Sequence, residues 1–197
     1  MIMTYEGIEV SVDVKLLVAN IQSYTETLRE KAVYKTGSIS PAASAYLWTL
    51  CEKFKPKTIV EIGTFIGNST LIMAGHATTL YTCDMNNDCI APSEVIKPYP
   101  KTGSTVMLWD LVQKGVKVDL FFFDGRIQGP DLALILRLSH PFTVYLFDDY
   151  ERMEKGTCNV GMLYPYLKEY TLVHPPKQVG DYDSTTCIAG LVPKEWV

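Results

Sequence analysis

The sequence predicts an α/β protein built on a doubly wound, mostly parallel sheet. From residue 56 onward, short apolar runs rich in β-branched residues alternate with segments of helical periodicity, as strand–helix units do in such sheets. Several of these apolar runs end in an aspartate. Because ligands bind beyond the carboxyl ends of the strands in doubly wound sheets, the aspartates mark the edge where a site is expected.

The length of 197 residues, with 47% hydrophobic and 20% charged residues, is typical of one globular domain. We expect a helical preface over residues 1–55, which serves as a lid, and an α/β core over residues 56–197. One preface helix is expected to start near Asp13, since apolar residues recur at helical spacing as far as Leu28. A second begins at Ser40 and Pro41, a cap followed by proline, and ends near Phe54.

The core elements are expected in alternating order. The expected strands are residues 58–62, 80–83, 105–108, 118–123 and 143–147, with a last, antiparallel strand over 185–192 that pairs with 171–173. The expected helices follow the glycine-containing turn at 63–69 and then cover residues 131–138 and 164–170. Residues 86–101 contain three prolines and are expected to be part loop and part short helix.

Charge and cysteine content exclude several classes of protein. The chain has 18 basic and 22 acidic residues, a net charge of −4, which argues against a nucleic-acid binder. It has no apolar run long enough to span a membrane, and its first ten residues do not resemble a secretory signal. Its five scattered cysteines form no CxxC pair, so we expect a cytoplasmic protein without a disulfide framework or zinc site.

The first motif is Glu61-x-Gly63-x-x-x-Gly67, between an expected strand and its helix. Glycines permit a tight turn and close approach of a ligand to the backbone. The loop lacks the GxGxxG spacing of dinucleotide folds and the Gly-Lys-Ser/Thr of phosphate loops, which counts against a nicotinamide-dependent oxidoreductase. Its spacing suits S-adenosylmethionine, which has no phosphate. The alternative is an ordinary strand–helix turn.

Carboxylates at the strand ends form the second motif. Asp84 follows the second strand about 20 residues after the glycine loop, where a carboxylate can accept both ribose hydroxyls; the alternative is a helix or turn cap. Asp124, Asp148 and Asp149 follow two further strands and suit a hard cation such as Mg²⁺. Alternatively, they cap helices or pair with nearby basic residues, namely Arg126, Arg152 or Lys155.

Aromatic residues are also expected at strand ends. Phe65, Trp109 and Tyr150 are placed to pack against an adenine, an aromatic substrate or a sulfonium group, whose positive charge aromatic faces attract. The alternative for each is an ordinary core or rim residue.

These segments resemble a known group of enzymes. Ile39-Ser40-Pro41 and the stretch from Lys57 to Thr70 are similar to the start of small class I O-methyltransferases, which include the caffeoyl-CoA and catechol enzymes. The later Asp-Leu-Phe-Phe-Phe-Asp-Gly and Leu-Phe-Asp-Asp-Tyr segments resemble the macrocin-type sugar O-methyltransferases of macrolide and aminocoumarin pathways. The resemblance covers about residues 38–155. It implies the Rossmann-like class I methyltransferase fold and S-adenosylmethionine as cofactor.

The resemblance also implies roles for matching positions. Glu61, Gly63 and Gly67 would shape the cofactor loop together with Thr64 and Asn68, and Phe65 and Ser69 would contact the methionine moiety. Asp84 would hold the ribose, while Met85, Trp109 and Asp110 would border the adenine. Asp124 would also contact the cofactor, and it matches a metal-binding position, as do Asp148 and Asp149.

One departure concerns the base. The catechol-type enzymes have a lysine shortly after the position of Asp124, whereas this chain has Arg126 there, whose pKa stays too high for a base. Asp149 or a metal-activated hydroxyl would serve instead, which makes Asp124 and Asp149 the candidate catalytic residues. The lid would come from the preface helices and residues 151–161.

We therefore expect methyl transfer from S-adenosylmethionine to a hydroxyl of a small molecule, with help from Mg²⁺. The resemblance is compatible with a homodimer. Two alternatives stay open, namely a metal-independent N- or protein methyltransferase and a cofactor-binding protein without catalysis. Activity that survives a chelator would favour the first, and tight cofactor binding without turnover would favour the second.

Overall fold

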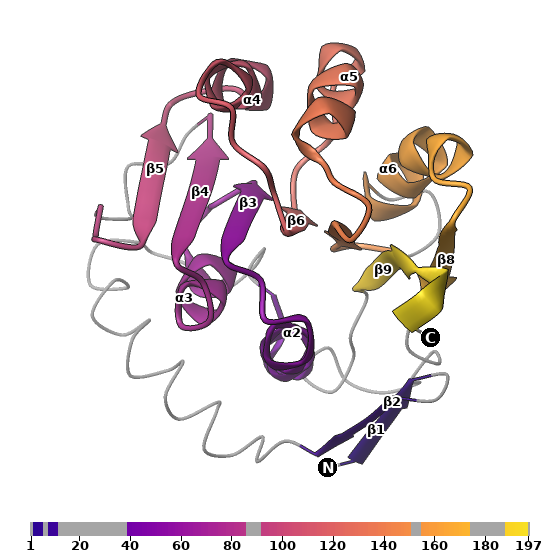
Figure 1. Ribbon diagram of the computed structural model, residues 1–197. Helices are drawn as coiled ribbons and strands as arrows, with labels where there is room; N and C mark the ends of the chain where they lie inside the picture. The colour runs from indigo at the N-terminus through magenta and orange to yellow at the C-terminus, as the bar shows by residue number, and fades with distance from the viewer. Residues whose placement is uncertain are drawn as a thin grey trace.

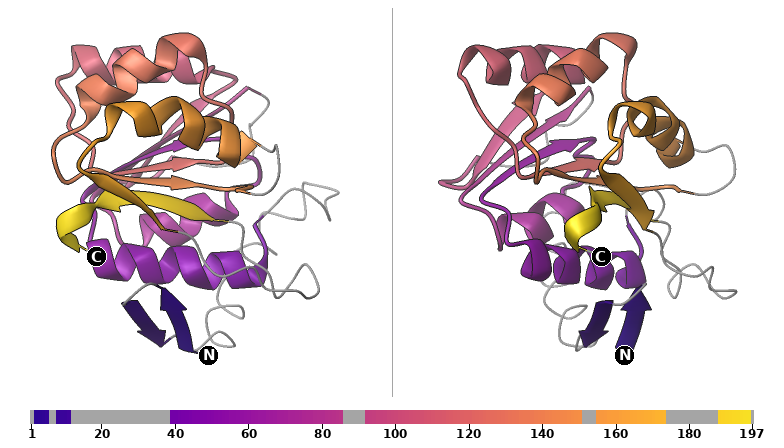
Figure 2. Two further views of the ribbon diagram at one scale, coloured as in Figure 1. Left: turned by 90° about the vertical axis from the view of Figure 1, so that its right-hand side faces the viewer. Right: turned by 45° about the vertical axis from the view of Figure 1, so that its right-hand side comes forward.

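A computed structural model describes residues 2–5, 8–11, 39–85, 92–150, 155–173 and 188–196. Within these, a seven-stranded sheet is covered by helices on both faces (Figures 1 and 2). The helix expected from Asp13 to Leu28 lies outside the described residues. No helix among the described residues is long and apolar enough to cross a membrane.

The strand order is β5-β4-β3-β6-β7-β9-β8, and the first five strands are parallel to one another. Strand β9 runs antiparallel to both of its neighbours, as expected for a last strand paired with residues 171–173. The strands are β3 (Thr58–Ile62), β4 (Thr79–Asp84), β5 (Ile96–Pro100), β6 (Leu120–Phe123), β7 (Val144–Phe147), β8 (Tyr170–Val173) and β9 (Ala189–Pro193). The predicted doubly wound α/β fold is confirmed.

Helices α2 and α3 cover one face of the sheet, and α4, α5 and α6 cover the other (Figure 1). Side chains alternate between the two faces, so Phe122 packs in one core cluster and Phe121 and Phe123 pack in the other. The helices are α2 (Pro41–Phe54), α3 (Asn68–Ala74), α4 (Ser104–Gln113), α5 (Gly129–Leu138) and α6 (Lys155–Leu163), with short 3₁₀ turns at Tyr164–Tyr166 and Lys194–Trp196.

Helix α2 begins as its sequence predicts. The Ser40 hydroxyl accepts a hydrogen bond from the backbone N–H of Ala43 at 3.1 Å, and Pro41 takes the first helical position. The helix ends at Lys55, whose left-handed backbone (φ 48°) lets its N–H donate to the Cys51 carbonyl. Buried Tyr46 and Leu47 place α2 against the sheet.

The preface, expected to be helical from near Asp13, begins with two short strands. Residues Ile2–Tyr5 (β1) and Ile8–Ser11 (β2) form an antiparallel pair. The alternation of apolar and polar residues over Ile8–Ser11 has the period of a strand, and we did not predict a strand there.

The strand expected over residues 105–108 is wrong, because Ser104–Gln113 form helix α4. The β-branched pair Thr105 and Val106 favours a strand locally, but the buried residues of this segment, Met107, Leu108 and Leu111, recur at helical spacing. Val106 is 63% exposed, which is incompatible with a buried central strand.

The third parallel strand lies instead in the proline-rich segment that we expected to be loop and short helix. Among the described strands, β5 pairs with β4 alone, so it is an edge strand of the sheet. An edge strand tolerates Pro98 and Pro100, because N–H groups on its outer side need no partner strand. Residues 86–91 lie outside the described residues.

The helix expected over residues 164–170 is also misplaced. Helix α6 occupies Lys155–Leu163, and Pro165 follows in a 3₁₀ turn before β8 begins at Tyr170. The apolar residues of 164–170 therefore belong to a turn and a strand start.

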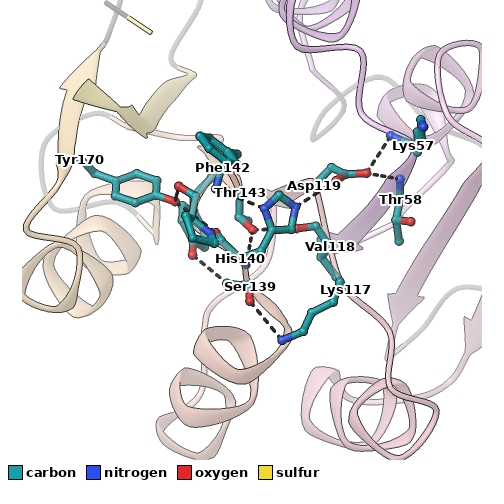
Figure 3. Close-up of polar contacts among 12 residues, drawn as sticks. Lys57, Thr58, Lys117, Val118, Asp119, Ser139, His140, Phe142, Thr143 and Tyr170 are labelled. Carbon is teal, nitrogen blue, oxygen red and sulfur yellow. Dashed lines mark hydrogen bonds and ion pairs between the residues drawn. The ribbon is translucent and has the colours of Figure 1, made fainter. Parts of the chain in front are cut away.

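A polar cluster joins three strands at their amino ends (Figure 3). The Asp119 carboxylate accepts hydrogen bonds from the backbone N–H groups of Lys57 and Thr58 at 2.9 and 2.8 Å. Its other oxygen lies 3.0 Å from Nε2 of His140. Since Nδ1 of His140 accepts from the Phe142 N–H, the neutral imidazole carries its hydrogen on Nε2 and donates it to Asp119. The cluster lies at the end of the sheet opposite the strand-end aspartates.

Candidate cofactor and active site

A cleft of about 470 Å³ lies at the carboxyl edge of β3, β4 and β6. Its volume is within the range of small-molecule and cofactor sites. The residues that line it come from three strand ends and from the start of α4: Ile62, Gly63, Cys83, Asp84, Met85, Thr102, Gly103, Ser104, Asp124, Gly125, Arg126 and Gln128. Four predicted site residues, Gly63, Asp84, Met85 and Asp124, therefore share one cavity.

The glycine loop allows the ends of β3 and β6 to approach each other closely. Gly63 has φ +97°, and a Cβ there would lie 2.9 Å from the backbone of both Asp124 and Gly125. Gly67 has φ 82° at the start of α3, and its N–H donates to the Thr64 carbonyl at 2.8 Å. Only glycine adopts these conformations without strain, so the predicted turn chemistry is confirmed.

Glu61 is fully buried beneath this loop and accepts three hydrogen bonds from hydroxyls. Ser69 and Thr70, at the start of α3, each donate at 2.5 Å, and Thr82 of β4 donates at 2.6 Å. Burial raises the pKa of Glu61 to about 7, although the three hydroxyl donors oppose this shift. The Ser69 hydroxyl is thus used inside the protein, and its predicted contact with the methionine moiety stays a prediction.

Asp84 connects the second strand to the loop. Its carboxylate accepts a hydrogen bond from the backbone N–H of Phe65 at 2.9 Å, and it lines the cleft. Phe65 has φ 47°, an unfavourable conformation for a residue with a side chain, and is 37% exposed. The loop residues Thr64 and Asn68 are buried. The arrangement ties the backbone of Phe65 to the carboxylate of Asp84 at the strand end.

Asp124, Asp148 and Asp149 also come together as the sequence predicts. One oxygen from each lies within 4.8 Å of the others. Asp148 is buried, whereas the Asp149 side chain is 41% exposed and its backbone has φ 53°. The two parallel strands β6 and β7 bring these carboxylates to one edge of the sheet.

Lys155 enters this carboxylate cluster from helix α6. Its Nζ lies 2.5 Å from Oδ1 of Asp124 and 2.9 Å from Oδ2 of Asp149. From the sequence, Lys155 was only one of three alternative ion-pair partners for the aspartates. It is the main residue of the site that the sequence did not single out. Its proximity to Asp149 in the chain is a weak signal for this contact.

Two further residues of α6 hold the helix against the site. A Cβ on Gly156 would lie 2.2 Å from the Asp148 carbonyl oxygen, so only glycine permits this approach. The buried Asn159 donates to the Gly125 carbonyl at 2.9 Å and accepts from the Ile127 N–H at 3.0 Å. Lys155 and Asn159 lie one helical turn apart, so both face the ends of β6 and β7. The sequence analysis did not single out Gly156 or Asn159.

The charges of the cluster shift the pKa values of its members. Burial, with the neighbouring charge of Asp148, raises the pKa of Asp124, while Lys155 opposes this shift. Burial alone would lower the pKa of Lys155, but Asp124 and Asp149 outweigh burial and raise it above its ordinary value. Lys155 is therefore a persistent cation at this position.

Trp109 and Asp110 do not lie at a strand end, so their expected placement is wrong. Both belong to α4, where Trp109 is 56% exposed and Asp110 forms an ion pair with Lys114 at 2.6 Å. The Tyr99 hydroxyl also donates to Asp110. Neither lines the cleft, to which this region contributes Thr102, Gly103 and Ser104.

The structure resembles solved O-methyltransferases, whereas no family model and no curated protein matches the chain. An O-methyltransferase from Bacillus cereus, solved with SAH, has a TM-score of 0.67 at 18% identity and covers 88% of this chain and 90% of its own. The O-methyltransferase TomG from Streptomyces achromogenes, involved in tomaymycin synthesis and solved with SAM, has a TM-score of 0.64 at 19% identity, covering 88% and 89%. The chain thus has the class I fold of S-adenosylmethionine-dependent O-methyltransferases.

The carboxylate cluster can be tested for its fit to a divalent metal. Three carboxylates are the ligand type that Mg²⁺ prefers. However, the Lys155 ammonium already contacts two of the three. With Lys155 in contact with two of the three carboxylates, the arrangement does not fit a divalent cation. The Mg²⁺ expected from the sequence is therefore not confirmed.

Proposed function

We propose that this protein transfers a methyl group from S-adenosylmethionine to a hydroxyl of a small molecule. The observation that carries the proposal is the cleft at the carboxyl edge of the sheet, where Gly63, Asp84 and Asp124 converge. Structural neighbours solved with SAM or SAH support this cofactor.

In this proposal, the cleft holds the cofactor through its own strand-end residues. Asp84 accepts the ribose hydroxyls, and Met85, which is 64% exposed, provides an apolar surface for the adenine. The close approach of Gly63 to Asp124 and Gly125 keeps side chains out of the space at the loop. The backbone of Phe65 is hydrogen-bonded to Asp84, and the proposal assigns its ring to the sulfonium, whose positive charge aromatic faces attract.

The reaction is a displacement at the methyl carbon. The acceptor oxygen forms a bond to the methyl carbon, the pair of the S–C bond returns to sulfur, and S-adenosylhomocysteine is left. The hydroxyl proton passes to Asp149, the most exposed carboxylate of the cluster and the candidate base. Alignment of the two reactants supplies most of the acceleration, since such positioning is worth roughly 7–11 kcal/mol.

One alternative is favoured by a specific observation. The Lys155 ammonium among the aspartates favours transfer without a metal, which is the condition of the metal-independent alternative that acts on nitrogen or on a protein side chain. The acidic net charge of −4 supports an acceptor other than nucleic acid. A cytoplasmic location and a homodimer remain expectations from the sequence.

Calorimetric titration with S-adenosylhomocysteine tests the proposal. We expect binding in the micromolar range, because the cleft offers both a ribose acceptor and an apolar surface. Absence of binding to folded protein would contradict the proposed function. A cofactor-binding protein without catalysis would bind equally well but transfer no methyl group to any panel of hydroxyl, amine and peptide acceptors.

A further inference from the structure

We propose that Lys155 is a tethered cation that takes the place of a divalent metal at the carboxylate cluster. The inference deepens the proposed function and rests on it for any role of Lys155 in catalysis. Whether the cluster binds a metal can be measured without reference to that function. It starts from the contacts of Nζ, at 2.5 Å from Asp124 and 2.9 Å from Asp149.

Helix α6 fixes the position of this lysine. Gly156, the next residue, packs so closely on the Asp148 carbonyl that no side chain fits between them. Asn159, one turn further, bonds to the backbone of both Gly125 and Ile127 at the end of β6. The start of α6 is therefore anchored to both loops that carry the carboxylates, and Lys155 cannot move away with the helix unless these contacts break.

The electrostatics favour the ammonium over a dissolved ion. The Asp124 side chain is only 10% exposed and that of Lys155 is 25% exposed, so the attraction between them is screened less than at a surface. A divalent cation would have to displace an ammonium held on the same chain. Mg²⁺ would also have to shed part of its hydration shell, which it does reluctantly.

Removal of the ammonium should create the metal site that the intact chain lacks. In Lys155→Met, the three carboxylates, which lie within 4.8 Å of one another, would lose the ammonium that contacts Asp124 and Asp149. Loss of this compensating charge is unfavourable, and a divalent cation would restore it. Lys155→Arg is the matched control, because it keeps a positive charge at the same place.

The test is a Mn²⁺ titration of the full chain, followed by electron paramagnetic resonance of the free ion. We expect the parent and Lys155→Arg to bind Mn²⁺ weakly, and Lys155→Met to bind it at least about tenfold more tightly. Addition of Asp124→Asn to Lys155→Met should abolish the gain. Tight Mn²⁺ binding by the parent, or no gain in Lys155→Met, would overturn the inference.

Two controls separate the possible failures. S-adenosylhomocysteine titrations on the same samples report whether each variant retains its cleft. Absence of this binding in the parent would contradict the proposed function but not the inference about Lys155. If Lys155→Met does not fold, the melting temperature of the parent decides the question. We expect no shift with millimolar Mn²⁺, and a clear increase would show that the parent binds the metal.

Discussion

At the scale of single residues, Glu61 shows how a buried carboxylate can organise a loop. It lies under the glycine turn and accepts hydrogen bonds from Ser69, Thr70 and Thr82, which belong to α3 and β4. One side chain thus joins two elements to β3. The family resemblance implied that Glu61 shapes the loop, and in the structure Glu61 lies beneath the loop and accepts hydrogen bonds from hydroxyl groups.

Glu61 should make the stability of the protein depend on pH. Its pKa is raised from an ordinary 4.5 to about 7, so the folded state binds this proton more tightly than the unfolded state. The resulting stabilisation is complete below pH 4.5 and is lost as the pH rises through 7, a change of about 3 kcal/mol. Urea denaturation at pH 5 and pH 8 measures it. Glu61→Gln should lack this component, and an equal pH dependence in both proteins would show that another group is responsible.

Asp84 is expected to carry much of the cofactor affinity. Asp84→Ala removes the proposed ribose acceptor and the acceptor of the Phe65 N–H, so S-adenosylhomocysteine should bind at least about tenfold more weakly. Calorimetry measures this change. Asp84→Asn is the control, because it keeps an oxygen for Phe65 and isolates the contribution of the charge. Unchanged affinity in Asp84→Ala would refute the assignment.

At the scale of elements, helix α6 takes part directly in the carboxylate cluster. It supplies Lys155, and its close packing depends on Gly156. The local sequence around Gly156 gives no sign of this, because the close approach involves the backbone of residues 148–150, which lie outside the helix.

Gly156→Ala should therefore destabilise the protein, by about 2–4 kcal/mol. A Cβ at this position would lie 2.2 Å from the Asp148 carbonyl oxygen, and the atoms that it would meet belong to the backbone rather than to a flexible side chain. Gly161→Ala is a matched control on the same helix, since a Cβ there meets nothing within 4 Å. This variant should be neutral or stabilised by up to about 1 kcal/mol. Urea denaturation of both variants gives the comparison, and equal stabilities would contradict the packing argument.

Helix α4 shows where local propensity fails. Thr105 and Val106 favour a strand, yet the segment is helical because its apolar residues Met107, Leu108 and Leu111 meet α5 and the sheet on one side. Trp109 and Asp110 were predicted at a strand end, but they lie on the surface of this helix.

At the scale of the whole molecule, the two ends of the sheet carry different features. The carboxyl ends carry the cleft, and the amino ends carry the Asp119–His140 cluster (Figure 3). Asp119 accepts two backbone hydrogen bonds from the start of β3 and contacts the segment before β7. It thus joins three neighbouring strands at a place where no cofactor contact is proposed.

Asp119→Ala should lower the free energy of unfolding by about 2–3 kcal/mol without changing the affinity for S-adenosylhomocysteine. Two backbone N–H groups and His140 would lose their acceptor. Lys117→Ala serves as the control, because its exposed Nζ donates to the carbonyls of Arg137 and Ser139 and should contribute little. A fall in cofactor affinity with Asp119→Ala would show that the two ends are coupled.

The sequence by itself determined the strands β3, β4, β6 and β7 and the carboxylates at the ends of the last three, Asp84, Asp124, Asp148 and Asp149. Each is a local signal, because a buried strand is a short apolar run and the residue after it lies at the sheet edge. Only the tertiary structure decided that α4 is a helix, that β5 is a proline-containing edge strand and that Lys155 meets Asp124. These features depend on contacts between distant parts of the chain, and Lys155 and Asp124 are 31 residues apart. Periodicity over a short window contains no information about such contacts.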